Sequence, residues 1–374
     1  MLLAIDVRNL QGGSWSGVGV YTDQVIHSLL ATDTHAECVL FSNSFSTSGA
    51  PIKHNNALNV HMRWPNMFFH ATMRFFQYPQ IDTGIEKITG KTVDVFFSPN
   101  FHFTALRRTV PYVITIHDLS FELYPEYYSL KRRLWHALVQ PKKQCEQAAA
   151  IIVPSHHTKT DLIRLYHIAE EKIHVVYPGM PIVHISNTNT EIVRNKYNVH
   201  NDFFLFVGTI EPRKNIDGIV AAYIRSGLHK KGVELVIAGA EGWKQHALMK
   251  RVARTPGVRY LGYIPEEDKQ LLFAEAKGCL FPSFYEGFGF PVIEAMQLGT
   301  PVITSDRSSL PEIAAGAAYL VNPYDVGAIA KGMERLFEDT ALCQELITRG
   351  RLVASTYSWD RAAAQMWHIF ESVV

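Results

Sequence analysis

The sequence is poor in cysteine, nearly balanced in charge and free of long apolar runs. Its four cysteines in 374 residues lie far apart, with no C-x-x-C pair and no histidine at zinc-ligand spacing. This argues against a disulfide scaffold and a structural zinc module, and it favours reduced thiols. The formal net charge of +1 gives no global reason to expect a nucleic acid partner.

The sequence also lacks the apolar segments that direct a chain into or across a membrane. No stretch approaches the roughly 18 consecutive apolar residues of a membrane-spanning helix. The N-terminal run MLLAIDVRNL carries Asp6 and Arg8 and has no signal-peptide core. We therefore expect a cytoplasmic protein, and we leave open a peripheral contact with the inner face of the cytoplasmic membrane.

The length and the hydrophobic pattern predict two domains. A chain of 374 residues exceeds what one hydrophobic core usually organises. Short apolar runs alternate with segments of helical period, which is typical of βαβ units and a parallel sheet. The expected strands are residues 2–7, 38–42, 93–98, 112–116, 151–154 and 173–177, then 203–207, 234–238, 259–261, 278–281, 302–304 and 319–321.

A stretch rich in Pro, Asn and Thr separates the two series of strands. It covers residues 178–200 and indicates an interdomain linker. The sequence therefore predicts an α/β protein with two Rossmann-like domains, residues 1–180 and 199–357, facing across a deep cleft.

A glycine-rich turn, LQGGSWSGVGVYT, directly follows the first expected strand. Gly12 and Gly13 permit a close backbone approach, and Gly17 and Gly19 open a helix whose N-terminus can hold a phosphate. The turn departs from the G-x-G-x-x-G dinucleotide fingerprint, and the strand near residue 38 does not end in an acidic residue. Both departures argue against a dehydrogenase.

His117 and Asp118 follow the apolar strand YVITI. In open α/β sheets, ligands bind at the carboxyl ends of the strands. A single histidine is more often a structural hydrogen-bonding group, but the pair at this edge favours a function.

A basic pair lies at a second strand-to-helix junction, in FLFVGTIEPRKN. The strand runs into Gly208 and Thr209, and Arg213 and Lys214 precede the next helix. Two cations at such a turn can hold a diphosphate, Arg through its planar fork and Lys as a point charge. An exposed basic pair is usually solvated, so the position at the junction is what favours a site.

Two carboxylates lie eight residues apart in YEGFGFPVIEAM. Glu286 precedes a turn with Gly287 and Gly289, and Glu294 lies in the helix that follows. On one helix, eight residues correspond to a rotation of about 80°, so both carboxylates are expected to address one ligand. A carboxylate that accepts two hydroxyl hydrogen bonds is a usual grip on a sugar or a ribose.

Residues 60–80 are aromatic and basic and contain no acidic residue. They include Arg63, Trp64 and Arg74. Two interpretations stay open: a core helix with solvated arginines, or an apolar and basic face that contacts a membrane or a lipid-linked acceptor.

The run E-G-F-G-F-P-x-x-E-A-M-x-x-G-T-P-V-I, residues 286–303, resembles glycosyltransferase family 4, whose members are retaining enzymes of GT-B fold. The resemblance covers nearly the whole chain. GGSWSGVGVYT is similar to the family's N-terminal glycine loop, IHDLS to its acceptor-side histidine element and GTIEPRKN to its phosphate grip. YSWDRAA is similar to the start of a terminal helix, residues 358–374, that returns to the first domain.

The resemblance implies an acceptor-side first domain and a donor-binding second domain. Glu294 would hold the donor ribose, Glu286 the hydroxyls of the transferred sugar, and Arg213 and Lys214 the diphosphate. His117 would contact the sugar near the reacting centre. The implied catalytic residues are His117, Arg213, Lys214 and Glu286. The implied donor-binding residues are Gly12, Gly13, Gly208, Thr209, Arg213, Lys214, Glu286, Gly287, Phe288, Gly289 and Glu294. The candidate acceptor or membrane residues are Arg63, Trp64, Arg74 and Asp118.

One position departs from the pattern of many family members. They carry Arg directly after the glycine of the VG element, where this sequence has Thr209. Arg213, next to Lys214, would replace that arginine, as in a subgroup that includes many bacterial mannosyltransferases.

We expect retaining transfer without a metal or another cofactor. The sequence contains no Asp-x-Asp element, and Arg213 and Lys214 would stabilise the leaving diphosphate. The subgroup favours GDP-mannose as donor and a lipid-linked bacterial surface polysaccharide, such as lipopolysaccharide O-antigen, as acceptor. UDP-glucose, UDP-N-acetylglucosamine and dTDP-rhamnose stay open, as does a non-catalytic glycan- or partner-binding protein, and the oligomeric state is not predicted.

Overall fold

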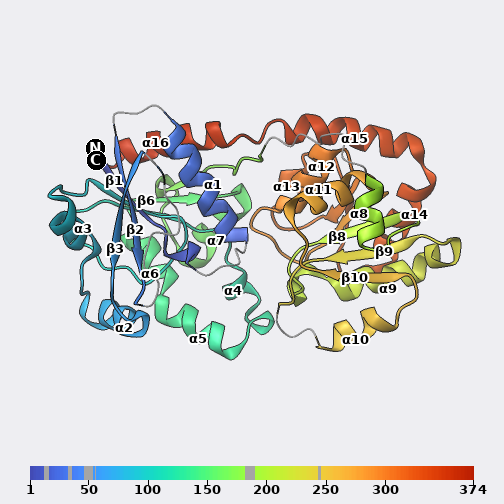
Figure 1. The fold of residues 1–374 in the computed structure, drawn as a ribbon, viewed down its shortest axis with the longest axis horizontal. Coiled ribbons are helices and arrows are strands. Elements are labelled where there is room, and N and C mark those ends of the chain that lie inside the picture. Colours follow the sequence, from blue (N-terminus) through green and yellow to red (C-terminus); the bar gives the residue numbers. More distant parts are fainter. Residues whose placement is uncertain (12–16, 33–35, 46–53, 55, 182–189, 243–245) are drawn as a thin grey trace. The chain divides into compact units, whose positions relative to one another are not determined.

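The chain folds into two α/β units, shown in Figure 1. The computed structural model describes all residues except 12–16, 33–35, 46–53, 55, 182–189 and 243–245. The first unit comprises Met1–Leu119, Leu130–Gly179 and Ser358–Val374. The second comprises Ser120–Ser129 and Met180–Tyr357, so a short segment inside the predicted first domain groups with the second unit.

The first unit is built on a parallel sheet with strand order β3-β2-β1-β4-β5-β6-β7. The strands are β1 (Leu2–Asp6), β2 (Glu37–Asn43), β3 (Ala57–Met62), β4 (Val95–Ser98), β5 (Tyr112–Thr115), β6 (Ala150–Val153) and β7 (Ile173–Val175). Every residue of β1, β4, β5 and β6 is buried, because helices cover both faces of a parallel sheet. The strand order reverses between β1 and β4, which makes their carboxyl ends the topological switch point.

The C-terminal helix packs on this first sheet. The unit's helices are α1 (Gly17–Ala31), α2 (Asn66–Phe76), α3 (Ile81–Thr89), α5 (Leu130–Val139), α6 (Pro141–Gln147), α7 (His156–Tyr166) and α16 (Trp359–Ser372). In α16, the Trp367 indole N–H donates to the Leu29 carbonyl of α1 at 3.3 Å. The Phe370 ring lies 5.1 Å from Phe97 of β4, so the chain's last helix covers the central strands (Figure 1).

The second unit repeats the same strand order, β10-β9-β8-β11-β12-β13, again all parallel. Its strands are β8 (Phe203–Val207), β9 (Glu234–Ala238), β10 (Val258–Gly262), β11 (Gly278–Phe281), β12 (Val302–Ser305) and β13 (Tyr319–Val321). Its helices are α4 (Ser120–Leu123), α8 (Thr190–Lys196), α9 (Ile216–Ser226), α10 (His246–Arg254), α11 (Glu266–Glu275), α12 (Phe290–Leu298), α13 (Leu310–Ala314), α14 (Val326–Glu338) and α15 (Thr340–Ala354). The switch point lies between β8 and β11.

The predicted linker is not wholly irregular. Its residues 190–196 form α8, which packs on α11. Val193 is buried, and Arg194 pairs with Glu275 at 3.2 Å. The sequence analysis did not identify this helix, because a seven-residue helix has too short an apolar pattern to stand out among polar neighbours.

A buried ion pair lies at the switch point of the first sheet. Arg8 Nη2 lies 2.5 Å from Asp6 Oδ2 and donates to the Phe103 carbonyl at 2.9 Å. Its guanidinium lies over the rings of Phe41 and Phe69. Burial would raise the pKa of Asp6, but the Arg8 charge together with the hydrogen bonds that Arg8 donates outweighs this effect and holds that pKa below its usual value.

Two histidines next to this pair stay neutral. The His70 and His102 rings lie 5.1 Å apart. Burial, and then the Arg8 charge, lowers the pKa of His70 to about 4 and that of His102 to about 3. Folding therefore removes proton-binding capacity that both side chains have in the unfolded chain.

This difference predicts a pH-dependent stability. The contribution is complete above the ordinary histidine pKa of 6.5 and is lost as the pH falls toward about 4. Each histidine should lower the free energy of unfolding by up to about 1.4 kcal/mol per pH unit in that range. Urea unfolding at pH 7.5, 6 and 5 measures the slope. His70→Gln with His102→Gln should flatten it, whereas His27→Gln, at an exposed position, should not; equal slopes in all three proteins would contradict the assignment.

Candidate functional site

A short basic turn follows β8 at the switch point of the second sheet. After Gly208 and Thr209, a single 3₁₀ turn (Pro212–Lys214) leads into α9. The Asn215 amide donates to the carbonyls of Pro282 at 3.1 Å and Pro323 at 2.7 Å. The basic turn is therefore fixed to the loops that follow β11 and β13.

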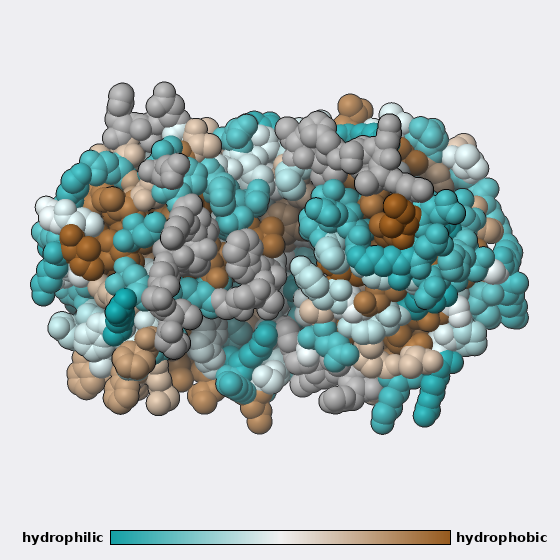
Figure 2. All heavy atoms as spheres, in the orientation of Figure 1, coloured by the Kyte–Doolittle hydropathy of each residue, from teal (hydrophilic) through white to brown (hydrophobic). Residues whose placement is uncertain are grey.

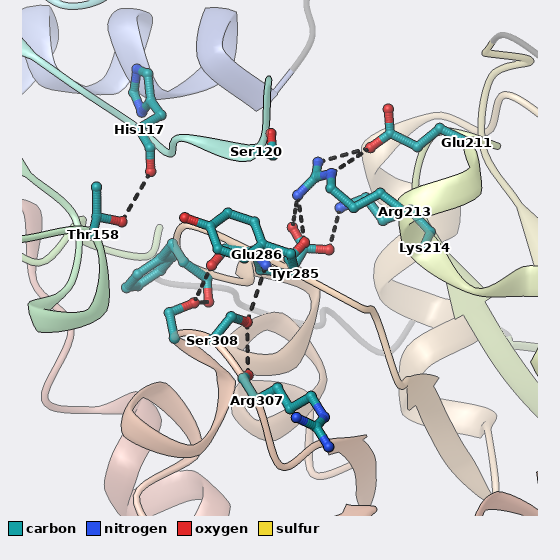
Figure 3. Close-up of polar contacts among 12 residues, drawn as sticks. His117, Ser120, Thr158, Glu211, Arg213, Lys214, Tyr285, Glu286, Arg307 and Ser308 are labelled. Carbon is teal, nitrogen blue, oxygen red and sulfur yellow. Dashed lines mark hydrogen bonds and ion pairs between the residues drawn. The ribbon is translucent and has the colours of Figure 1, made fainter. Parts of the chain in front are cut away.

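Glu286 lies in the loop after β11 and bonds both cations of that turn. Arg213 Nη1 donates to Glu286 Oε2 at 2.8 Å, and Lys214 Nζ donates to Oε1 at 2.7 Å (Figure 3). Burial alone would raise the pKa of Glu286, but the Arg213 and Lys214 charges outweigh it and hold that pKa below its usual value. Glu286 is therefore an ionised carboxylate.

A second carboxylate completes the cluster. Arg213 Nη2 donates to Glu211 Oε1 at 2.8 Å, and Arg213 Nη1 also reaches the Tyr285 carbonyl at 2.8 Å. The side chains of Arg213, Lys214 and Glu286 are only 14%, 12% and 6% exposed. The charges of two cations and two carboxylates therefore neutralise each other in a place that is largely shielded from water. Our sequence analysis did not identify Glu211, although it lies two residues before Arg213 in the same motif.

Two serines after β12 hold the Glu286 loop. The Glu286 N–H donates to Ser308 Oγ at 3.1 Å (Figure 3). The buried Ser309 hydroxyl bridges the carbonyls of Glu286 and Phe288, at 3.0 and 2.8 Å. The sequence analysis missed both serines, because nothing local relates them to residues more than 20 positions earlier.

The turn after Glu286 requires glycine at position 289. Gly289 has φ 115°, and a Cβ there would lie 2.7 Å from Leu310 Cδ2. Helix α12 then begins at Phe290, with Pro291 in its first turn, where the fixed φ of proline suits a helix start. The start of this helix directs backbone N–H groups toward the region of Gly287 to Gly289.

Glu294 forms an ion pair with a different cation, Lys269. It lies on α12 and pairs with Lys269 of α11 at 2.9 Å, and Lys269 also pairs with Glu266. Burial raises the pKa of Glu294, and the Lys269 charge opposes that rise. Glu286 lies before α12 and Glu294 lies within it, and the two carboxylates pair with different cations.

His117 and Asp118 belong to the first unit, where they follow β5. His117 Nε2 lies 2.8 Å from the Pro99 carbonyl, and because a carbonyl only accepts, this nitrogen carries the proton. The His117 carbonyl accepts from Thr158 Oγ1 (Figure 3). Burial lowers the pKa of His117, so the ring is neutral. Gly12 and Gly13 lie outside the described residues, and their role stays a prediction.

Both halves of the chain match families of known enzymes. Residues 15–183 match the family model described as Glycosyltransferase Family 4, and residues 188–353 match that described as Glycosyl transferases group 1. The chain is 32% identical over 278 residues to O-antigen chain mannosyltransferase B of Escherichia coli, covering 72% of each chain. It is 28% identical over 262 residues to the serotype-specific mannosyltransferase WbdA of Escherichia coli, covering 67% of this chain and only 32% of that longer protein. Sucrose-phosphate synthase from Thermosynechococcus elongatus superposes with a TM-score of 0.75 at 20% identity, covering 100% of this chain and 99% of that one.

These matches confirm the resemblance carried by the motifs and the predicted GT-B fold. The chain belongs to glycosyltransferase family 4. It is a glycosyltransferase, and nucleotide-sugar donors and glycan acceptors are the ligands of its class.

The ion cluster predicts a stability effect at Glu286. Glu286→Gln removes the carboxylate partner of Lys214 and leaves Arg213 with Glu211 alone, and breaking a buried ion pair in this way typically costs about 3–5 kcal/mol. We expect the melting temperature to fall by several degrees in differential scanning calorimetry. Glu338→Gln is the matched control, because it removes the same charge from an exposed pair with Lys231 and should change little. Equal melting temperatures for both variants would show that the cluster does not hold the loops together.

Proposed function

We propose that this enzyme transfers mannose from GDP-mannose to a growing, lipid-linked bacterial surface polysaccharide of the O-antigen type. The names of the Escherichia coli relatives support the sugar and the pathway, and the E-P-R-K-N element supports the donor subgroup. The observation that carries the proposal is the cluster of Arg213, Lys214 and Glu286 at the switch point of the second sheet.

In this proposal Arg213 and Lys214 meet the diphosphate. The bond between the anomeric carbon and the diphosphate oxygen breaks, and negative charge grows on the leaving group. Two cations that are already fixed in a dehydrated site stabilise that charge without moving during the reaction. This mechanism therefore requires no metal ion.

Glu286 serves as a ligand of the transferred sugar, not as a nucleophile. A carboxylate offers about four acceptor positions, and the two cations occupy one on each oxygen, which leaves positions for sugar hydroxyls. Its lowered pKa and its two cation partners make it a poor nucleophile. Retention then follows from attack of the acceptor hydroxyl on the face that the diphosphate leaves, with its proton passing to the departing phosphate oxygen.

Glu294 is proposed to hold the donor ribose through its carboxylate. Lys269 would keep that carboxylate ionised and oriented. His117 is proposed to contact the sugar, and Gly12 and Gly13 to approach the diphosphate. A neutral His117 ring whose Nε2–H is already bonded to the Pro99 carbonyl suits positioning better than proton transfer.

The donor is tested by a thermal-shift panel of GDP, UDP, dTDP and ADP with their common sugar conjugates, each with and without EDTA. GDP and GDP-mannose should raise the melting temperature selectively, and EDTA should not alter the rise. A response to UDP or dTDP would keep the enzyme class and replace the donor by a glucosyl, N-acetylglucosaminyl or rhamnosyl nucleotide. Silence across the panel would favour a glycan- or partner-binding protein without activity.

Lys214→Ala tests the proposed contact with the leaving group. We expect kcat to fall about 100- to 1000-fold, because the lysine acts on charge that grows in the transition state. The melting temperature should fall less than in Glu286→Gln, since Arg213 still neutralises that carboxylate. Lys231→Ala, on the surface of the same unit, should leave both quantities unchanged. A kcat close to that of the wild type would remove Lys214 from the mechanism.

A further inference from the structure

Helix α2 of the first unit exposes more large apolar side chains than it buries. Only Phe69 and Met73 are buried. Met67, Phe68, Phe75 and Phe76 are between 63% and 81% exposed. Phe68 and Phe75, seven residues apart, point within about 20° of each other, and Met67 and Phe76 lie on either flank, so the four side chains cover about half of the helix circumference. The sequence left two interpretations of residues 60–80 open, and this exposure argues against a simple core helix.

Helix α5 carries a second apolar stripe, which the sequence analysis did not identify. Leu130, Leu134 and Leu138 recur every four residues and are all exposed, with Leu130 at 79% and Leu134 at 62%. Val139 is the only buried residue of α5. A stripe of exposed leucines with polar side chains on both flanks is typical of a helix that lies at a membrane interface.

The two helices flank one segment of the first unit. His70 of α2 stacks on Phe103 at 4.8 Å, and Trp135 of α5 packs against Phe101 at 5.7 Å. A shallow pocket between them is lined by Arg74 of α2 and by Lys143 of α6, which follows α5 directly. In Figure 2, apolar side chains gather along the lower edge of the first unit, where Figure 1 places α2 and α5.

The two segments that carry the stripes are rich in basic residues, and Glu146 at the end of α6 is the first acidic residue after α5. Residues 60–80 and 129–145 contain no Asp or Glu. Their seven cations are Arg63, Arg74, Lys131, Arg132, Arg133, Lys142 and Lys143. The whole chain has a formal net charge of only +1, so this positive charge is local. Exposed Phe and Leu beside several Lys and Arg residues fit a surface that is apolar inside and anionic outside.

We propose that α2 and α5 form a docking face for an anionic phospholipid bilayer. Met67, Phe68, Phe75, Phe76 and the three leucines enter the boundary between headgroups and acyl chains. The basic side chains lie at the headgroups, and Arg74 and Lys143 bind a lipid phosphate in the pocket between the helices. Among the described residues no helix is long and apolar enough to cross a bilayer, so the contact is with one leaflet. The assignment rests on the proposed function in one respect, that the acceptor is lipid-linked.

Vesicle co-sedimentation of the full chain, without donor, tests this face. The wild type should sediment with vesicles of phosphatidylcholine and phosphatidylglycerol, and far less with phosphatidylcholine alone. Replacing Lys131, Arg132 and Arg133 by Gln should weaken partitioning on the order of 100-fold, since each cation near an anionic surface contributes a factor of about five. Leu130→Ser with Leu134→Ser should also abolish sedimentation.

Two control substitutions test whether a loss of sedimentation is specific to α5 or follows from the loss of any exposed apolar side chain. The controls are Ile88→Ser, on α3 of the same unit, and Leu352→Ser, on α15 of the second unit, and both replace exposed residues. Neither substitution should change sedimentation. Unchanged melting temperatures establish that the variants are folded. Equal sedimentation of the wild type and the α5 variants, or self-association in place of vesicle binding, would overturn the proposal.

The outcome is independent of the donor. Vesicle binding needs no nucleotide sugar, so a silent thermal-shift panel would reject the proposed function and leave the docking face intact. Conversely, a GDP response that is equal in wild type and α5 variants, together with absent vesicle binding, would reject the docking face alone.

Discussion

The second unit is organised around the neutralisation of one buried carboxylate. Glu286 is 6% exposed, and an ionised group in such a place is stable only if opposite charges and hydrogen bonds replace its water. Both cations come from the turn after β8, while Glu286 comes from the loop after β11. The ion pairs therefore join the two loops that border the switch point. The Phe284 N–H, which donates to the Arg213 carbonyl at 2.9 Å, adds a backbone bond to the same junction.

This arrangement also explains how two adjacent cations stay in place before a ligand arrives. Arg213 and Lys214 are neighbours in sequence and mostly buried, so their mutual repulsion would open the turn if no anion were present. Glu286 and Glu211 supply that anion permanently. In the proposed mechanism, a diphosphate would meet cations that are already oriented, which is the condition for electrostatic preorganisation.

The parts of this architecture that the sequence predicted are those with a local signal. Buried parallel strands are continuous apolar runs, so FFLFV and GCLF were located at their observed bounds, and both site loops follow directly from them. The edge strand β3 (Ala57–Met62) was missed because its exposed positions interrupt the apolar pattern with Asn59 and His61. Glu211 pairs with Arg213 only two positions away, but the contacts of the two serines and of Lys269 span more than 20 positions, and no periodicity encodes them.

The two units handle positive charge in opposite ways, and the difference bears on what each can bind. In the second unit, two buried cations are matched by two carboxylates, so their effect is confined to a ligand that enters the cluster. Around α2 and α5 of the first unit, seven Lys and Arg residues lie in segments with few acidic residues, and the field of exposed cations extends into solvent over about a Debye length. A cluster of matched charges suits one small anion that fits its geometry. Basic residues beside exposed Phe and Leu suit an extended anionic surface, and overall composition conceals them because the averages over 374 residues are those of an ordinary globular protein.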